Sequence, residues 1–139
     1  MAEAPMRLNA ATNGALRILM LCREDRPLTM PEMMRQLGLT EALVIKTCNE
    51  LMQAGMLVGQ RGRGGGYRLN RPASSIGALD IIDLFEAKQN LFPCRVGESG
   101  ECRILSVCKL RRACEKAHAA FRGELETLTV ADLALDADV

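Results

Sequence analysis

The chain has 139 residues, of which 48% are hydrophobic and only 3% aromatic, and its formal net charge is +1. This length allows one compact domain with an extended arm, and no apolar run approaches the eighteen or so residues of a membrane span. Leu, Ile, Met and Ala must therefore fill the core, which favours helices over a β-sandwich. The charge is uneven: residues 1–72 carry ten Lys or Arg and six Asp or Glu, and residues 73–139 carry eight and eleven. A basic front half can face a polyanion, although chance also allows so small a difference.

The first segment with helical periodicity spans residues 10–23. Its apolar positions, including Ile18 and Cys22, recur three or four residues apart, which predicts one buried face. Cys22 lies on that face, so we expect it to be a small buried apolar residue and not a metal ligand.

Two further helices, joined by a short turn, follow this segment. Thr29-Met-Pro-Glu32 is a capping-box pattern with proline in the first turn, so a helix begins there and ends at Gly38. Thr40 caps the next helix, which runs to Gly55. The connection between the two helices, residues 37–40, has the length found in helix-turn-helix units.

The residues of this last helix divide between two faces. We expect one set to face the core: Val44, Cys48, Leu51 and Met52. The other set lies nearer the opposite face: Glu41, Ala42, Ile45, Lys46 and Asn49.

A glycine- and arginine-rich tip, residues 62–66, lies between two strand-like runs and predicts a β-hairpin. Helix, helix-turn-helix and hairpin is the order of a winged helix, whose second helix enters the DNA major groove while the hairpin lies along the backbone or minor groove. Arg61 and Arg63 can neutralise phosphates or enter a narrow minor groove. A nucleotide-binding loop is the rival interpretation, but no Gly-Lys-Ser/Thr follows the tip and no helix opens after it.

Two more helices are predicted in the second half of the chain. Ser74 or Ser75 is expected to cap a helix that reaches about Ala87, and a long helix is expected from Cys108 to about Leu128. The long helix carries an apolar stripe at helical spacing: Leu110, Cys114, Ala117, Phe121, Leu125 and Leu128. A stripe of this length needs a cover, and the second subunit of a dimer is a natural candidate beside packing on the same chain.

Three cysteines occur in the segment Cys94–Cys108, with seven residues between the first pair and five between the second. Thiolates suit iron–sulfur clusters, zinc or Cu(I), and structural zinc sites usually use tighter pairs. The wider gaps favour an iron–sulfur cluster, with zinc and purely structural cysteines as the alternatives. Residues 1–9 lack the features of a secretory signal, so we expect a cytoplasmic chain, in which disulfides are rare.

These motifs together resemble the Rrf-type regulators, the family that contains IscR, NsrR and RirA. The wing and the three-cysteine segment carry most of the resemblance, and the matching pieces cover nearly the whole length: residues 6–8, 12–17, 61–69, 72–76, 94–108 and 129–133. The resemblance implies a homodimeric winged-helix transcription factor, usually a repressor, whose binding to operator DNA depends on a cluster held by three cysteines. Carried over to this chain, those ligands are Cys94, Cys102 and Cys108.

The chain departs from the family pattern at the position of the fourth ligand. IscR-like members have a histidine three residues after the third cysteine, where this chain has Arg111, and some NsrR-like members have an aspartate where this chain has Asn13. The fourth-ligand region is therefore expected around Asn13, Glu98 or Glu101, with water or a small molecule as alternatives. A weakly held corner suits a sensor of iron supply, nitric oxide or oxygen, and the resemblance favours iron slightly over nitric oxide.

The sequence thus predicts a mainly α protein with a small β-hairpin wing, and not an enzyme. Residues 1–75 form the winged helix-turn-helix, and residues 76–139 comprise a linker helix, the cysteine loop 94–108 and the dimerisation helix. The expected partners are double-stranded operator DNA and a second copy of the chain, with no membrane and no small-molecule substrate. The expected cofactor is a 4Fe–4S or 2Fe–2S cluster, and a metal-free thiol sensor or a zinc-containing regulator is the alternative. The expected DNA contacts are Thr40, Glu41, Ala42, Leu43, Lys46, Arg61, Gly62 and Arg63.

Overall fold

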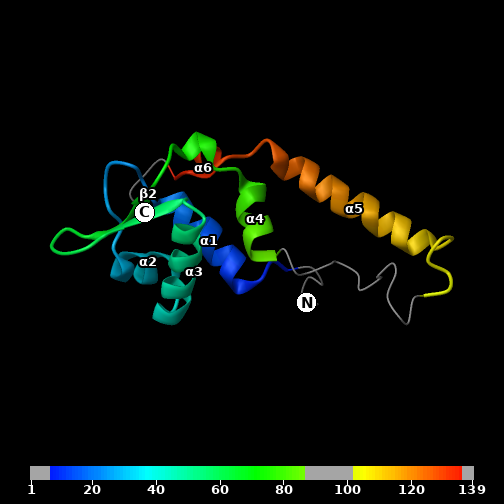
Figure 1. The fold of residues 1–139 in the computed structure, drawn as a ribbon, viewed down its shortest axis with the longest axis horizontal. Helices are drawn as coiled ribbons and strands as arrows, with labels where there is room; N and C mark the ends of the chain where they lie inside the picture. Colours follow the sequence, from blue (N-terminus) through cyan, green and yellow to red (C-terminus); the bar gives the residue numbers. More distant parts are fainter. Residues whose placement is uncertain (1–6, 87–101, 136–139) are drawn as a thin grey trace.

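The computed structural model describes residues 7–86 and 102–135 of the chain. In chain order its elements are α1 (Ala10–Leu21), α2 (Met30–Leu37), α3 (Glu41–Gln53), β1 (Leu57–Gln60), β2 (Gly66–Leu69), a 3₁₀ turn η1 (Ala73–Ser75), α4 (Ala78–Glu86), α5 (Lys109–Glu126) and α6 (Val130–Leu133). Figure 1 shows two regions: a head formed by residues 7–86 and 128–135, and an arm formed by residues 102–127, from which α5 projects. The predicted fold class, mainly α with a hairpin wing, is confirmed.

The core of the head lies where α1, α2, α3 and the base of the wing meet. Ile18 and Leu19 of α1, Met33 of α2 and Leu51 of α3 have no exposed surface, and the Cys48 thiol lies 3.9 Å from the Met33 sulfur. Val44, Cys48 and Leu51 are buried as predicted, whereas Met52 is half-buried. The apolar periodicity of these helices therefore identified most of the core side of α3.

Capping residues fix where the first three helices begin. The Asn9 side chain accepts a hydrogen bond from the Thr12 amide, and Thr29 and Glu32 form a reciprocal capping box. Thr40 Oγ1 accepts from the Leu43 amide at 3.4 Å, and Gly38 ends α2 in the left-handed conformation with φ 64°. The starts of α2 and α3 predicted from Thr29 and Thr40, and the α2 end predicted from Gly38, agree with the structure.

The wing is an antiparallel hairpin held to the body of the head by a third short pairing. β1 and β2 pair in the register Leu57↔Leu69 to Gln60↔Gly66, and Leu28 bridges Tyr67 through two backbone hydrogen bonds of 2.8 and 2.9 Å. Gly66 has φ 149°, and a Cβ at this position would lie 2.6 Å from the Leu28 carbonyl oxygen. Only glycine allows the wing to approach the α1–α2 connection this closely.

The prediction that Ser74 or Ser75 caps the next helix is wrong. Both residues lie in η1, and α4 begins only at Ala78. The intervening backbone is extended because Gly77 bridges Thr129 and the Val130 amide donates to the Ile76 carbonyl at 2.8 Å. A pairing with the far end of the chain therefore delays the helix, and the predicted end at Ala87 lies outside the described residues.

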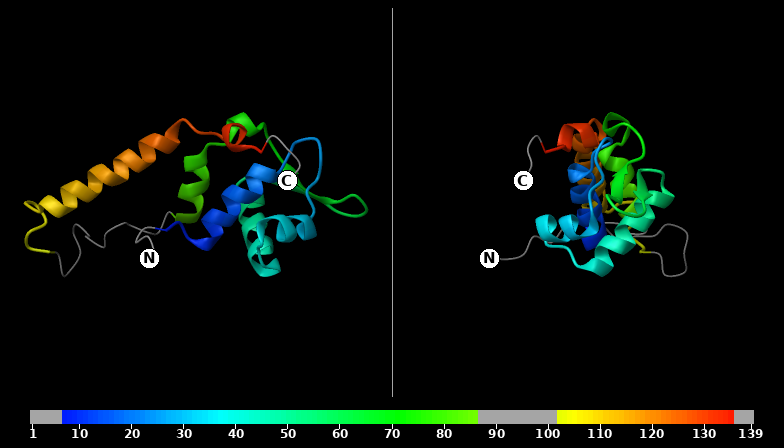
Figure 2. Two further views of the ribbon diagram at one scale, coloured as in Figure 1. Left: turned by 180° about the vertical axis from the view of Figure 1, so that it is seen from behind. Right: turned by 90° about the vertical axis from the view of Figure 1, so that its left-hand side faces the viewer.

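The arm consists largely of α5, and no residue of α5 is buried. Figure 2 shows from behind how the helix extends away from the head, so that only its C-terminal end lies near α4. Arg122 joins the two helices through hydrogen bonds of 2.6 and 2.9 Å to the two carboxylate oxygens of Asp83. Among the described residues, no helix is long and apolar enough to cross a membrane.

Candidate nucleic-acid interface and cysteine region

Helix α3 presents three distinct faces. One faces the core through Val44, Thr47, Cys48 and Leu51, all without exposed surface. A second face, formed by Leu43, Lys46 and Glu50, lies beside α1 and α4. The third face is exposed to solvent: Glu41, Ala42, Ile45 and Asn49.

The predicted DNA-contact residues of α3 do not all lie on one face. Thr40, Glu41 and Ala42 are exposed at the start of the helix, in the position from which a recognition helix contacts bases. Leu43 is half-buried beside α1, and Lys46 is exposed but also lines the second face. Ile45 and Asn49 are exposed on the outward face of α3. Their helical spacing predicts that they lie on the side away from the core, but they are not among the predicted DNA contacts.

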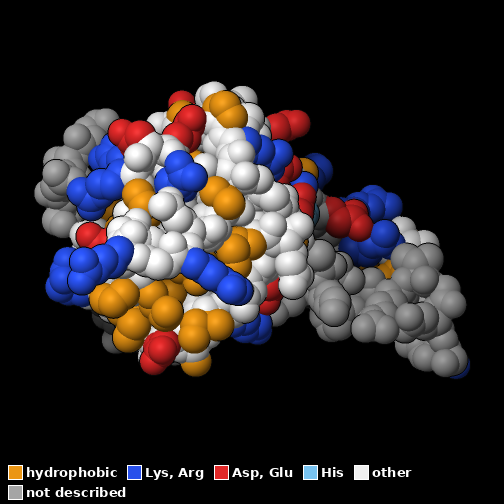
Figure 3. Space-filling view, turned by 60° about the vertical axis from the view of Figure 1, so that its left-hand side comes forward, with side chains coloured by type: hydrophobic (Ala, Val, Ile, Leu, Met, Phe, Trp, Pro, Cys, Tyr) orange, Lys and Arg blue, Asp and Glu red, His pale blue; other side chains and the backbone are white. Residues whose placement is uncertain are grey.

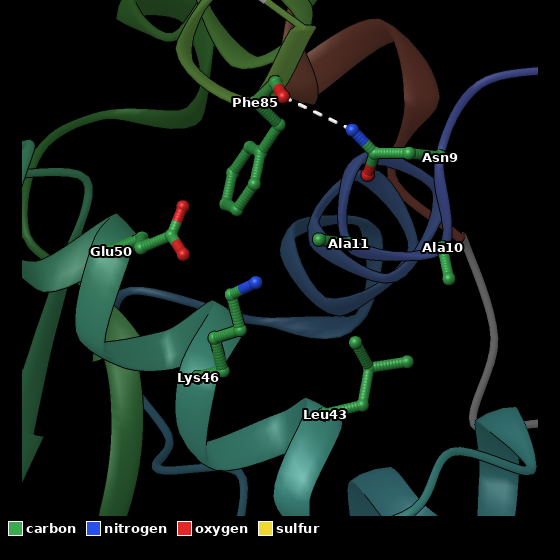
Figure 4. A pocket seen from close by; sticks show the side chains of 7 residues that line it. All are labelled: Asn9, Ala10, Ala11, Leu43, Lys46, Glu50 and Phe85. Carbon is green, nitrogen blue, oxygen red and sulfur yellow. Dashed lines mark hydrogen bonds between the residues drawn. The ribbon is translucent and has the colours of Figure 1, made fainter.

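A pocket of about 310 Å³ lies between the start of α1, the middle of α3 and the end of α4. In Figure 4 the Lys46 ammonium and the Glu50 carboxylate point into it from α3, opposite the Phe85 ring and Ala11. The side-chain amide nitrogen of Asn9 donates a hydrogen bond to the Phe85 carbonyl at 3.0 Å across the rim of the pocket. Neither Asn9 nor Phe85 was singled out in the sequence, because their proximity depends on how α4 packs on α1.

The start of α1 is also tied to the last residue of α4. The Glu86 carboxylate accepts a hydrogen bond from the backbone N–H of Asn9 at 2.7 Å and another from the hydroxyl of Thr12. Thr12 has no exposed surface. Glu86 is the last described residue before the segment that contains Cys94. This junction therefore fixes the end of α4 on the start of α1.

The wing tip is exposed and carries the two predicted arginines. Arg61, Gly62 and Arg63 all face solvent, and the turn closes through a 3.0 Å hydrogen bond from the Gly65 amide to the Gly62 carbonyl. Gly62 has φ 90°, so the tip follows a path that glycine adopts readily. Figure 3 shows the side of the head that carries the wing, where Lys and Arg side chains lie next to a group of hydrophobic ones. Such a surface can bind the phosphates and the groove of a duplex together.

The cysteines belong to two chemically different groups. Cys22 and Cys48 are buried in the head, and burial raises the pKa of each thiol to about 12. Cys102 is exposed and Cys108 half-buried, and both are free in the arm. The two head cysteines therefore pack as small apolar residues of the core, as predicted.

Cys108 occupies the N-cap position of α5. Its sulfur accepts a hydrogen bond from the Arg111 amide at 3.4 Å. The adjoining sequence supplies the basic residues Lys109, Arg111 and Arg112, and the N-terminus of a helix favours negative charge near it. Arg111 is engaged with Glu115 at 2.7 Å, so the position that holds histidine in IscR-like members forms an ion pair within α5.

The remaining predicted ligands are placed only in part. Cys94, Glu98 and Glu101 lie outside the described residues, and Asn13 is exposed on α1. Within residues 7–86 and 102–135, no group of three His, Cys, Asp or Glu side chains is arranged to hold a metal ion. The donor chemistry of Cys102 and Cys108 nevertheless fits a thiolate-bound centre, with an accessible sulfur and a helix-capping sulfur in the same short stretch.

A helix-turn-helix followed by a glycine-tipped wing defines the class of winged-helix DNA-binding proteins. The chain belongs to the Rrf2 family, described as an iron-dependent transcriptional regulator, whose model matches residues 8–136. The predicted family is thereby confirmed. The chain is consequently a member of a family of DNA-binding transcriptional regulators.

Individual relatives agree with this assignment. The chain is 35% identical over 130 residues to "Protein aau3" of Rhizobium meliloti (strain 1021), an alignment that covers 92% of this chain and 84% of that protein. Its fold is similar to that of CymR, the global cysteine regulator of B. subtilis, with a TM-score of 0.72, 22% identity and coverage of 96% and 99% of the two chains. It is also similar to IscR of T. potens, with a TM-score of 0.69, 21% identity and coverage of 93% and 86%.

Proposed function

We propose that the chain is a homodimeric repressor whose affinity for operator DNA is set by an iron–sulfur cluster, 4Fe–4S or 2Fe–2S, held by Cys94, Cys102 and Cys108. The signal is iron availability, nitric oxide, or both. The carrying observation is the separation of the cysteines: Cys22 and Cys48 are buried in the core, while Cys102 is exposed and the half-buried Cys108 caps α5. The iron-dependent description of the family supports the same proposal.

The fourth ligand is the most weakly bound part of such a site. Asn13, Glu98 and Glu101 remain the candidates, together with water or a small molecule. When bound, the cluster supplies an iron centre with one exchangeable position, which suits a sensor. The chain itself supplies the thiolates, and the α5 N-terminus with its basic neighbours stabilises the negative charge near Cys108.

Contacts within the chain connect this region to the DNA-binding helix. Arg122 of α5 binds Asp83 of α4, and the end of α4 is fixed to the start of α1 by Glu86. Phe85 of α4 and Lys46 of α3 line the same pocket. We infer that gain or loss of the cluster alters the position of α4 and hence of α3. In a dimer, this changes the separation of two recognition helices that must lie about one DNA turn apart.

The exposed apolar stripe of α5 supports the homodimer. Leu110 is 61% exposed and Phe121 39% exposed, and α5 has no buried residue within the described part of the chain. A second copy of the same helix would cover both side chains through a self-complementary interface.

A metal-free thiol-sensing or zinc-containing regulator is the second candidate. The fold likeness to CymR, a global cysteine regulator, favours considering it, as do the three free cysteines placed in the arm. Acid-labile sulfide separates the candidates because only an iron–sulfur cluster contains it.

The test begins with protein purified without oxygen, for which iron, sulfide and visible absorption are measured per chain. We expect matching iron and sulfide, and operator binding that weakens by about 5- to 150-fold when the cluster is removed. Cys102→Ala should bind as weakly as the cluster-free protein. Cys114→Ala is the matched control, since Cys114 lies on α5 outside the ligand set, and it should retain the cluster. A colourless wild-type protein, or tight operator binding by Cys102→Ala, would exclude the proposed mechanism.

A further inference from the structure

Ile45 is a large aliphatic residue on the outward face of α3, with 41% of its surface exposed. It stands apart from its neighbours: Val44 and Leu51 have no exposed surface, and Leu43 is half-buried beside α1. A solvent-exposed isoleucine adds little to helix stability, because its β-branched side chain is a weaker helix former than Ala, Leu or Lys. Its position therefore suggests a contact outside the chain.

The three faces of α3 determine which side chains can reach a base. Lys46 points into the pocket beside Phe85, so it lies to one side of the outward face (Figure 4). Glu41, Ile45 and Asn49 are spaced four residues apart and form one line along the exposed side of the helix. Ile45 is the middle residue of this line, and of the three it alone has an apolar side chain.

An apolar side chain in the major groove has one well-defined target. Among the four bases only thymine presents a methyl group there, and apolar side chains contact it. In a helix the χ1 angle of isoleucine is almost entirely confined to one rotamer, so the contact costs little side-chain entropy. Resting on the proposed DNA-binding function, we propose that Ile45 reads the C5 methyl group of a thymine in each operator half-site.

The neighbours of Ile45 complement this contact without duplicating it. The Glu41 carboxylate repels phosphates but can accept a hydrogen bond from cytosine, and the Asn49 amide can pair with adenine. Arg61 and Arg63 at the wing tip supply the sequence-independent phosphate contacts. Thymine discrimination is therefore separable from overall affinity by mutation.

The experiment uses the duplex that the full-length protein selects from a randomised pool, with each thymine in turn replaced by deoxyuridine. The two duplexes differ only by a methyl group, and Kd is measured for each. For the wild type we expect one position in each half-site where deoxyuridine weakens binding by about fourfold, the effect of one buried methyl group. Ile45→Ala should bind the thymine and deoxyuridine duplexes equally at that position, and Ile45→Val should retain part of the difference.

Two control variants isolate the contact. Arg61→Ala should weaken binding to both duplexes alike, and Asn49→Ala should keep the fourfold difference while changing the preference at another base pair. Thymine discrimination that survives in Ile45→Ala, or a wild type insensitive to every thymine methyl, would overturn the inference. If operator binding does not depend on the cluster but thymine discrimination persists, the proposed cluster-dependent regulation is overturned. The inference about Ile45 then stands.

Discussion

The head and the arm use amphipathic helices in opposite ways. Helices α1, α2 and α3 bury their apolar stripes against one another, so that Ile18, Met33 and Leu51 have no exposed surface. Helix α5 has a stripe of the same kind, yet none of its residues is buried. The difference shows that apolar periodicity predicts a face that needs a cover, and that the rest of the chain decides whether the cover is intramolecular.

The cysteines divide along the same boundary. In the head, Cys22 and Cys48 are buried and pack as apolar side chains, whereas in the arm Cys102 is exposed and Cys108 is half-buried. Residue type alone does not distinguish these roles. Their surroundings do, because burial in the core stabilises the neutral thiols of Cys22 and Cys48, whereas Cys102 and Cys108 lie outside that core.

The largest contrast is expected in thiol chemistry. Burial raises the pKa of Cys22 and Cys48 to about 12, so at pH 8 their thiolate fraction is about 1000-fold below that of an ordinary thiol. Alkylation of the cluster-free protein, followed by peptide mass spectrometry, should label Cys102 rapidly and the two head cysteines only after unfolding. Labelling of Cys22 in the native protein would show that the head opens locally.

A substitution in the α5 stripe should have the next largest effect. Replacing Phe121 by Asp would remove an apolar contact twice in the proposed symmetric dimer, and we expect dimerisation to weaken by about 2–4 kcal/mol. Sedimentation equilibrium measures this change directly. Ala119→Asp adds the same charge away from the stripe and should leave the dimer intact. An unaffected Phe121→Asp dimer would mean that another surface joins the subunits.

Close packing within the head can be tested at two wing glycines. Gly66→Ala places a Cβ against the Leu28 carbonyl at a φ of 149°, and we expect a loss of about 2–3 kcal/mol in the free energy of unfolding. Gly64→Ala, at φ 70° with open space around it, should lose only about 1 kcal/mol. Urea unfolding compares the two. Equal losses would indicate that the wing base is not tightly packed on Leu28.

The joint between head and arm should make the smallest contribution. The hydrogen bond from Arg122 lowers the pKa of Asp83. The pair's stabilisation is therefore present above the pKa of the unfolded carboxyl, about 3.9, and is lost as pH falls through the lower folded value. Thermal unfolding should show Asp83→Asn slightly less stable than wild type at pH 7, with the gap closing below about pH 4. A gap independent of pH would point to packing instead of charge.

Local signals in the sequence predicted much of the head. Thr29-x-x-Glu32, Thr40 and Gly38 act through contacts within a few residues, so the boundaries of α2 and α3 could be read from them. Glycines at the wing tip likewise predicted the hairpin. The exposed side of α3 followed from helical spacing alone.

Pairings between segments far apart in the chain could not be predicted from the sequence. The start of α4 was misplaced because Ile76 and Gly77 pair with Val130 and Thr129, more than fifty residues away. The short helix α6 is not among the predicted elements, although Thr129 and Asp132 form a capping box at its start. The junction of Glu86 with Thr12 and the pocket beside Lys46 also depend on tertiary packing, which no local pattern encodes.

The strand-like pairing of residues 76–77 with 129–130 has a consequence for the architecture of the polypeptide. The chain leaves the head after Glu86 and rejoins it at Leu128, whose carbonyl accepts from the Ala78 amide at 2.9 Å. The C-terminal end of the arm is therefore anchored on α4 both by this bond and by the Arg122–Asp83 pair. A short Gly/Ser bridge in place of residues 87–127 should give a minimal, constitutively monomeric reader of DNA.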